Sequence, residues 1–415
     1  MKSPVVAVIG GGPAGLMAAG QAASCGAAVV LLEKMPTPGR KLCITGKGRC
    51  NITNVAELPD FLEHFGAGGR FLHQPFARFF TPALLAFFEN LGLPVVVERG
   101  GRVFPQSGQA RDVLRILQGW VHRAGVRVRT GAPVSRLRIR GQRVIGVVLD
   151  NGEKVSCDAV VIATGGASYP GTGSTGDGYR LARDTGHLLV APRPALVPLE
   201  TEMDTTPLAG LSLRNVQVRL LVKGKKKRQL FGEMAFTRSG VSGPVILTLS
   251  GAAVDGLRAG QQVSLVVDLK PALDEPRLDA RLLRDFSARA REPLSSVLRG
   301  LLPRELVGIC LAQTGLVPEK PAAQVRAKER RRLKSWLKNF RLEISGYRPL
   351  KEAIVTAGGV DTREADPRTM QSKRVAGLYF AGEVLDIQGD TGGYNLQAAF
   401  STGWLAGRSA AGTTG

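Results

Sequence analysis

Three glycines close to the N-terminus have the spacing of a turn that binds a pyrophosphate. Gly10, Gly12 and Gly15 form the pattern GxGxxG. The first glycine of such a pattern permits a tight turn, the second lets the backbone approach the phosphates, and the third allows a helix to contact a strand closely. Glu33 follows at the distance from which a carboxylate accepts hydrogen bonds from an adenosine ribose. This combination of residue types predicts a dinucleotide-binding site.

The hydrophobic pattern predicts the elements that would position these residues. Residues 5–9 are a continuous apolar run rich in β-branched side chains, as expected of a buried parallel strand. Residues 16–24 are rich in alanine and predict a helix, and residues 28–32 predict a second strand that ends at Glu33. The start of the helix would offer N–H groups and a positive dipole to the phosphates. This context favours dinucleotide binding over a plain structural turn.

Two later segments indicate which dinucleotide is bound. Residues 160–166 predict a buried strand ending in Ala-Thr-Gly-Gly, and residues 377–383 predict a strand followed by an acid, with Asp386 close behind. The segment 392–395 then opens a predicted helix over residues 396–408. A helix start directed at a flavin would stabilise the negative charge that builds up on reduction. Both ends of the chain returning to one cofactor indicates FAD.

Four longer motifs carry a resemblance to a known family. They are residues 39–54, 168–178, 236–244 and 377–403. With them the chain resembles the BaiN/RdsA (YhiN-type) family of FAD-dependent oxidoreductases over nearly its whole length. The family pattern usually has histidine where Arg238 stands and glycine where Lys47 stands, so this chain departs from it at two positions. The fold class that the resemblance implies is α/β, a Rossmann-type two-dinucleotide-binding FAD domain with an inserted β-barrel plus helical domain.

The motifs and the resemblance together predict the residues that bind FAD. They are Gly10, Gly12, Pro13, Ala14, Gly15, Glu33, Lys34, Arg40, Lys41, Thr45, Val134, Thr164, Gly165, Gly382, Glu383, Asp386, Gly393, Tyr394, Asn395, Leu396 and Gln397.

A second GxGxxG pattern, Gly171, Gly173 and Gly176, raises the alternative of an independent nicotinamide site. The preceding strand ends at Thr164, so this turn does not directly follow its strand, and the pattern favours a flexible loop beside the flavin. The family resemblance also implies no separate nicotinamide domain. We therefore expect NAD(P)H to act as a transient electron donor.

The chain pattern predicts an insertion within the FAD domain. A proline-spaced linker lies at residues 191–198, and alternation of apolar and polar residues follows it, as in a barrel or sandwich. Apolar residues at helical spacings then occupy residues 275–342. The predicted domains are the first part of the FAD domain at 1–192, a β-barrel-like domain at 193–273, a helical subdomain at 274–345, and the second part of the FAD domain at 346–415.

The loop at residues 39–54, which the resemblance places beside the isoalloxazine ring, holds the predicted catalytic residues. A protonated Cys50 thiol would donate a proton to a substrate carbon while the flavin delivers hydride. The alternative is an inert, buried side chain, and the same alternative holds for Cys43. Arg49 and Asn51 would polarise a carbonyl or imide, or else anchor the loop.

Composition excludes several classes of protein. The five cysteines are odd in number and form no CxxC pair, so neither a disulfide framework nor a structural zinc site is expected. The four histidines have no metal-ligand spacing, and we expect structural or surface roles for them and no bound metal. The apolar runs are too short for a membrane span, and no export signal is visible. A cytoplasmic protein with reduced thiols is expected.

The charge balance points to a polyanionic partner. Lys and Arg number 56 against 34 Asp and Glu, a net charge of +22. Residues 196–345 alone hold 26 basic and 15 acidic residues. The alternative is a soluble enzyme from an arginine-rich proteome, whose basic surface serves solubility alone. The residues expected to contact ribosomal RNA are Lys223, Lys225, Lys226, Lys227 and Arg228 at a hairpin tip, and Arg331 and Arg332 on a helix predicted over 326–341.

The resemblance leaves two classes of function open. The first is reduction of a uridine in large-subunit ribosomal RNA to dihydrouridine, with hydride added to C6 and a proton to C5 of a base extruded from its stack. The second is a flavin oxidase or reductase of a small molecule, such as an amine or an enone or keto compound. A third class, redox sensing without turnover, rests on Cys43 and Cys50 alone.

Overall fold

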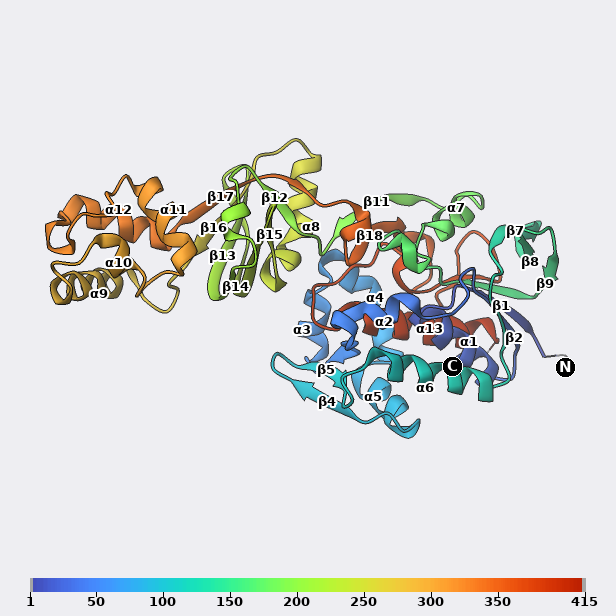
Figure 1. Ribbon diagram of the computed structural model, residues 1–415. Coiled ribbons are helices and arrows are strands. Elements are labelled where there is room, and N and C mark those ends of the chain that lie inside the picture. Colours follow the sequence, from blue (N-terminus) through green and yellow to red (C-terminus); the bar gives the residue numbers. More distant parts are fainter. Residues whose placement is uncertain (1–2, 413–415) are drawn as a thin grey trace. The chain divides into compact units, whose positions relative to one another are not determined.

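The computed structural model describes residues 3–412, and the chain divides into two units (Figure 1). Unit 1 comprises Met1–Ala195 and Leu350–Gly415, and unit 2 comprises Leu196–Pro349. From the sequence, we predicted that the chain leaves the FAD domain after residue 192 and returns to it at residue 346. Each unit has a hydrophobic core of its own.

A five-stranded parallel sheet forms the centre of unit 1, with strand order β19-β10-β1-β2-β6. Its two central strands are almost wholly buried, which is why their sequences are continuously apolar rather than alternating. The order brings together segments from the start, middle and end of the chain. The strands are β1 (Val5–Ile9), β2 (Ala28–Leu32), β6 (Arg127–Arg129), β10 (Ala159–Ile162) and β19 (Leu378–Phe380).

Two long helices, α1 (Pro13–Ser24) and α13 (Tyr394–Ala410), are in close contact in unit 1. Glycines permit this contact, because a Cβ atom at Gly403 would lie 2.3 Å from the carbonyl oxygen of Ala14. Gly407 approaches Ala18 in the same way, at 2.2 Å. The helix that follows the first glycine turn and the helix at the end of the chain are thereby held side by side.

Smaller elements complete unit 1. Three further sheets have the orders β3-β5-β4, β7-β8-β9 and β11-β18. The helices are α2 (Arg40–Ile44), α3 (Leu58–Glu63), α4 (Gly69–Arg78), α5 (Thr81–Asn90), α6 (Ala110–Arg123) and α7 (Asp177–Arg183). The strands are β3 (Thr53–Asn54), β4 (Val95–Glu98), β5 (Arg102–Pro105), β7 (Val134–Arg140), β8 (Arg143–Leu149), β9 (Lys154–Ser156), β11 (Leu189–Ala195) and β18 (Val355–Val360).

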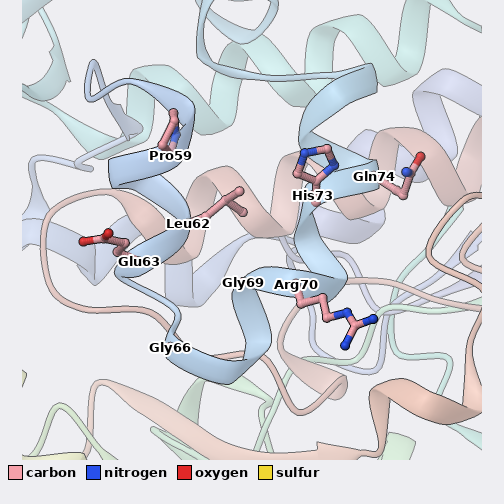
Figure 2. A pocket seen from close by; sticks show the side chains of 8 residues that line it. All are labelled: Pro59, Leu62, Glu63, Gly66, Gly69, Arg70, His73 and Gln74. Atoms are coloured by element: carbon pink, nitrogen blue, oxygen red, sulfur yellow. The ribbon is translucent and has the colours of Figure 1, made fainter.

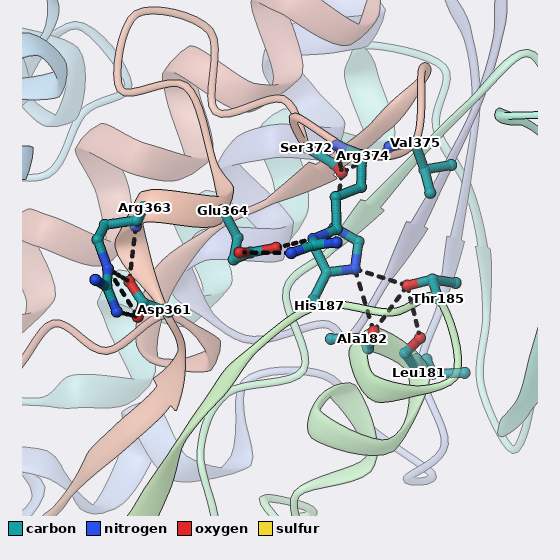
Figure 3. Close-up of polar contacts among 10 residues, drawn as sticks. All are labelled: Leu181, Ala182, Thr185, His187, Asp361, Arg363, Glu364, Ser372, Arg374 and Val375. Carbon is teal, nitrogen blue, oxygen red and sulfur yellow. Dashed lines mark hydrogen bonds and ion pairs between the residues drawn. The ribbon is translucent and has the colours of Figure 1, made fainter.

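A buried histidine joins α7 to the C-terminal part of unit 1 (Figure 3). His187 Nδ1 lies 3.1 Å from the carbonyl oxygen of Ala182, and its Nε2 lies 2.7 Å from Ser372 Oγ. Ser372 Oγ already accepts the backbone N–H groups of Arg374 and Val375, so its own proton is left for Nε2. The network therefore holds His187 as a neutral imidazole with its proton on Nδ1.

Unit 2 contains a closed barrel, which confirms the predicted barrel. The strand order is β12-β15-β14-β13-β16-β17, with α8 (Pro244–Arg258) packed against β13 and β14. Alternate residues of β13, such as Val216, Val218 and Leu220, are buried, as the alternation in the sequence predicts. The strands are β12 (Leu199–Thr201), β13 (Ser212–Val222), β14 (Lys225–Thr237), β15 (Gly240–Ser242), β16 (Val263–Asp268) and β17 (Phe340–Tyr347).

The helices of unit 2 differ from expectation at one end. They are α9 (Glu275–Ala288), α10 (Leu294–Leu298), α11 (Arg304–Thr314) and α12 (Ala327–Lys338). The helix predicted over 326–341 was too long, because the chain leaves the helix at Asn339 and Phe340 opens β17, which pairs with β16 and closes the barrel. Phe340 is buried in β17, and an apolar residue at this position also fits the spacing of a helix that continues from Trp336.

Candidate cofactor and active site

The three glycines of the N-terminal turn have different surroundings. A Cβ atom at Gly10 would lie 2.6 Å from the carbonyl oxygen of Ala163, and one at Gly15 would lie 1.8 Å from that of Gly10. A Cβ atom at Gly12 would meet no atom of residues 3–412 within 4 Å. The fold itself therefore requires the first and third glycines, whereas Gly12 borders open space.

Helix α1 begins directly after Gly12 and has the features of an anion-binding terminus. Its N-cap residue makes no side-chain hydrogen bond, and its first turn contains no acid. The first N–H groups of a helix lack partners within the helix, so they and the helix dipole are available to a phosphate.

Glu33 is fixed against the same turn. It is the residue after β2, and its carboxylate accepts N–H groups from Gly11 at 2.6 Å and Met35 at 2.8 Å. The neighbouring Lys34 forms an ion pair with Asp177 at 2.6 Å. The second GxGxxG segment lies beside Lys34 and Met35, since a Cβ atom at Gly173 would contact both.

Lys41 and Glu383 were both predicted to bind the cofactor, and the structure brings them together. Lys41 Nζ lies 2.9 Å from Glu383 Oε2 and 2.6 Å from Ser168 Oγ. The backbone N–H of Thr356 donates to Glu383 Oε1 at 2.7 Å. In the sequence, Ser168 stands out only as part of the motif at residues 168–178, and no sequence signal points to Thr356.

At the N-terminus of α13, backbone N–H groups rather than side chains are available to a ligand. Its N-cap, Gly393, has a φ of 101°, and a Cβ atom there would lie 2.3 Å from the carbonyl oxygen of Thr53. Asn395 Nδ2 donates to the Gly389 carbonyl at 2.9 Å, and Gln397 Oε1 accepts from Thr53 Oγ1 at 2.7 Å. These two predicted site residues thus hold the protein together, and the first N–H groups of the helix remain for a ligand.

The loop that carries the predicted catalytic residues is strained. Lys47 and Cys50 have φ values of 58° and 61°, in the left-handed region that favours glycine. The conformation of Lys47 gives a physical reason for the glycine that is usual at this position in the resembling family. Strained backbone of this kind is concentrated at functional sites.

The three predicted catalytic residues differ in how they are held. Cys50 is fully buried, and burial raises the pKa of its thiol to about 12. Asn51 Oδ1 is buried and has no hydrogen-bond partner among residues 3–412, and the same is true of Thr164 Oγ1. The Arg49 guanidinium lies 4.2 Å from the ring centroid of Phe104 and is paired with Glu98.

Unpartnered buried oxygens carry a cost. A buried acceptor without a donor costs about 1–3 kcal/mol, so ligand donors at Asn51 and Thr164 would remove a real penalty. Together with two uncapped helix termini, these oxygens fit a large ligand that carries both phosphates and hydrogen-bonding groups.

The remaining predicted cofactor residues also lie in unit 1. The carbonyl of Val134 accepts from Arg180, and the hydroxyl of Thr45 donates to the carbonyl of Leu42 at 2.7 Å. Gly382 N–H donates to Thr402 Oγ1, and Asp386 Oδ1 accepts from Gly358 N–H. Pro13 and Ala14 belong to α1 and Leu396 to α13, Arg40 is exposed at the start of α2, and Gly165 has a φ of 72°.

A surface hollow of about 470 Å³ lies between α3 and α4 (Figure 2). Its rim includes Glu63, Arg70, His73 and Gln74. None of the residues predicted to bind FAD lines this hollow. It is therefore separate from the site built around the glycine turn.

The sequence of this chain matches a known family along almost its whole length. The model of the HI0933-like protein Rossmann domain matches residues 4–409. The chain belongs to the HI0933-like family. The resemblance drawn from the loop motifs is thereby confirmed, and the enzyme is a FAD-dependent oxidoreductase.

Two relatives that are similar to this chain over nearly its whole length have different names. The chain is 33% identical over 408 residues to the 3-dehydro-bile acid delta(4,6)-reductase of Clostridium scindens, covering 98% of each chain. It is 30% identical over 402 residues to the ribosomal RNA dihydrouridine synthase of Haemophilus influenzae, covering 96% of each. The family therefore indicates the class of reaction and leaves the substrate open.

Solved structures support the fold. The 3-ketosteroid-delta4-(5alpha)-dehydrogenase of Rhodococcus jostii RHA1 superimposes with a TM-score of 0.51 at 17% identity, covering 98% of this chain and 96% of the other. The predicted Rossmann-type architecture is confirmed.

Among residues 3–412, no helix is long and apolar enough to cross a membrane. Nor do three His, Cys, Asp or Glu side chains gather within those residues as a metal site would require.

Proposed function

We propose that this enzyme reduces a uridine of large-subunit ribosomal RNA to dihydrouridine in the cytoplasm, using FAD that NAD(P)H reduces. The observation that carries the RNA substrate is the basic hairpin of unit 2. Lys225, Lys226 and Lys227 are exposed and form no ion pair with any residue from 3 to 412. Lys223 and Gly224 form the turn, both with positive φ, as in the tight turns that join two strands. Such a row of free cations suits a phosphate backbone.

The helix α12 supports the proposal less strongly than the hairpin does. Its Arg330, Lys334 and Lys338 pair with the acids Asp279, Glu275 and Asp268. Only cations without such partners can neutralise phosphates, and Arg331 and Arg332 are both exposed. We therefore expect Lys225, Lys226 and Lys227 to contribute most of the electrostatic attraction, and Arg228, which already has a partner within the protein, to contribute less.

FAD would be held by unit 1, and when bound it supplies the two electrons of the reduction. The turn at Gly10–Gly15 and the start of α1 would hold the pyrophosphate, and Glu33 the ribose. The N–H groups at the start of α13 would face the flavin and stabilise its negative charge. Lys41, already paired with Glu383, would add positive charge nearby.

The chemistry requires a proton for the carbon next to a carbonyl. Uracil C5=C6 is conjugated to the C4 carbonyl, so hydride addition at C6 leaves negative charge on C5 and the carbonyl oxygen. Cys50 would protonate C5, and Asn51 and Arg49 would polarise the carbonyl. A thiol with a pKa near 12 keeps its proton at neutral pH and releases it only to a strong base such as this carbon.

A second candidate is the reduction of a small enone. The relative from Clostridium scindens is named as a bile acid reductase and is 33% identical to this chain. An enone and a uracil ring both place a C=C bond beside a carbonyl, so the same donor and polarising groups would serve either substrate. We prefer the RNA substrate because the binding of a steroid would leave the lysines of the hairpin without a role.

The deciding experiment is mass spectrometry of nucleosides from the ribosomal RNA of a strain that lacks the protein. Dihydrouridine in the large-subunit RNA should disappear and should return when the gene is restored. A full complement of dihydrouridine in the deleted strain would overturn the RNA proposal. Reduction of a bile acid enone by the purified enzyme would then favour the second candidate.

The hairpin has its own test. Replacing Lys225, Lys226 and Lys227 with Ala should flatten the slope of log affinity against log salt by about 2–3, if each contacts a phosphate. The matched control replaces Lys351, Arg368 and Lys373, which are exposed in unit 1, and removes the same charge. An equal change in both variants would mean that net charge alone attracts RNA.

A further inference from the structure

One aromatic side chain has a position unlike all the others. Phe231, on β14, is 58% exposed. Among residues 3–412, every other Phe, Tyr and Trp is buried or half-buried. A phenyl ring that stays in water forgoes the favourable free energy of burial, and its free face is available for stacking.

The register of the hairpin places Phe231 on the outer face of the barrel wall. Phe231 lies opposite Gln217, and Gln229 lies opposite Arg219. The neighbouring Leu230 is more enclosed, in keeping with the alternation of a strand. The ring therefore shares its face with polar neighbours and with charges of both signs, Arg219 across the hairpin and Glu233 two residues along β14, rather than with the barrel core.

The hairpin also has a free edge. Strand β15 pairs with the stretch from Ala235 to Thr237 of β14. Within residues 3–412, the lysine-bearing half of β14 therefore has β13 as its one strand partner. Lysines on such an edge protect it from pairing with other chains. Edge protection is a role that lysines can fill beside phosphate binding, but it gives no role to Phe231, because an exposed apolar ring on an edge has the opposite effect.

We propose that the outer face of the β13–β14 hairpin binds single-stranded RNA, with Phe231 stacking on an unpaired base and Lys225, Lys226 and Lys227 contacting the backbone beside it. This inference rests on the proposed RNA substrate and adds which part of the RNA is recognised. Aromatic rings that alternate with cations are how proteins bind single strands, since every base has a face on which to stack. The distance along β14 from Phe231 to Lys227 is about 13 Å, so one short strand can touch both.

The test compares Phe231→Leu with wild type, using a fluorescent uridine-rich single-stranded oligoribonucleotide and fluorescence anisotropy. Losing one base stack should weaken binding roughly 5- to 100-fold. The salt slope should stay unchanged, because no charge is removed. This pattern differs from that of the lysine variants, which change the slope. Phe231→Trp should retain wild-type affinity or improve on it.

Two controls separate stacking from other effects. Val317→Ala alters a residue of unit 2 that is 57% exposed and should leave binding unchanged. A duplex of the same sequence should bind wild type and Phe231→Leu equally, because paired bases are not free to stack. All variants should unfold at the wild-type temperature.

The outcomes separate this inference from the proposed function. If Phe231→Leu binds the single strand as tightly as wild type while the deleted strain lacks dihydrouridine, the stacking surface is wrong and the RNA substrate stands. If wild type binds no RNA and the deleted strain keeps its dihydrouridine, both fail. A loss of binding that is equal for single strand and duplex would also overturn the stacking role.

Discussion

At the scale of single residues, the glycines of the first turn separate the needs of the fold from those of the ligand. Gly15 is required by the protein, since a Cβ atom there would lie 1.8 Å from a carbonyl oxygen, whereas Gly12 faces open space. Gly12→Val should therefore unfold at the temperature of the wild-type apoprotein but lose FAD on gel filtration. Absorbance at 450 nm against protein concentration measures the loss.

Gly15→Ala is the contrasting variant. It should destabilise the apoprotein by more than 1 kcal/mol, the scale of an overpacked position. Full FAD occupancy in Gly12→Val would show that the pyrophosphate lies elsewhere. A melting temperature that falls equally in both variants would remove the distinction between the two glycines.

The second prediction concerns the buried thiol. Cys50→Ala should leave reduction of the flavin by NAD(P)H unchanged and slow its reoxidation by substrate by about 10²-fold or more, a typical contribution of a general acid. Because the pKa of Cys50 is raised to about 12, reoxidation in wild type should not fall between pH 8 and 10, where an ordinary thiol loses its proton. Stopped-flow absorbance follows each half-reaction.

Cys43→Ala is the control, since Cys43 is half-buried in the same loop. Slowing of both half-reactions in Cys50→Ala would indicate a damaged flavin site rather than a lost proton donor. Unchanged rates in both would indicate that the thiol is structural.

Sequence reasoning named many site residues but not their partners. The acid and the lysine of the Lys41–Glu383 pair stand in motifs at opposite ends of the chain, and nothing in either motif shows that they meet. Asn395 and Gln397 were predicted to touch FAD, yet their side chains bond to the protein. Side-chain direction depends on tertiary contacts, which a local pattern does not contain. The roles of all these residues toward FAD stay predictions.

At the scale of elements, the junction between α7 and β11 depends on a neutral histidine (Figure 3). Burial lowers the pKa of His187, and Arg374 lowers it further, while the hydrogen bond to the Ala182 carbonyl and the charge of Glu364 act in the opposite direction. The folded protein thus binds fewer protons here than the unfolded chain does. This contribution to stability is complete above the unfolded pKa of about 6.5 and is lost as the pH falls below it.

We therefore expect the free energy of unfolding to fall by up to about 1.4 kcal/mol per pH unit below pH 6.5 through this group. Urea denaturation between pH 5 and 8 measures it. His187→Gln should remove this part of the slope, whereas His122→Gln, at an exposed position of α6, should leave it intact. The same slope in all three proteins would assign the pH dependence to other groups.

The limits of prediction at this scale lie at ambiguous apolar residues. The spacing of Leu333, Trp336 and Phe340 suits one helix, but Phe340 belongs to the strand that closes the barrel. A pairing between residues 263–268 and 340–347 is invisible to local periodicity, because it joins strands separated by the four helices α9 to α12. The strands β1 and β2, by contrast, were predicted with their observed bounds. Both are buried on both faces, so their sequences are short continuous apolar runs with clear ends.

At the scale of the whole molecule, the fold class was predictable and the substrate was not. The glycine turn and its flanking strands are formed by residues that are close together in the sequence. This part of a Rossmann-type fold can therefore be predicted from a local sequence pattern. Substrate choice depends on surfaces built by long-range contacts. Phe231 shows this, since only the barrel register reveals that its ring is exposed beside the lysines.

The two hydrophobic cores, one in each unit, lead to the last prediction. In the part of the chain that the structure describes, no buried core residue of unit 1 belongs to the core cluster of unit 2. Calorimetry should therefore resolve two unfolding transitions, and each ligand should raise only the transition of the unit that binds it. FAD at 100 times its Kd adds about 2.7 kcal/mol, which should raise the unit 1 transition by roughly 5–10 °C. FMN, which lacks the adenosine expected at Glu33, should raise it less.

Single-stranded RNA should shift the other transition in the same experiment. If the lysines and Phe231 of unit 2 bind RNA as proposed, the unfolding temperature of unit 2 should rise. The FAD-dependent transition should keep its temperature. Phe231→Leu should halve the rise or remove it, with no effect on the response to FAD. A single transition that every ligand moves would mean that the two cores unfold together, and a response of unit 2 to FAD would place part of the cofactor site on the inserted unit.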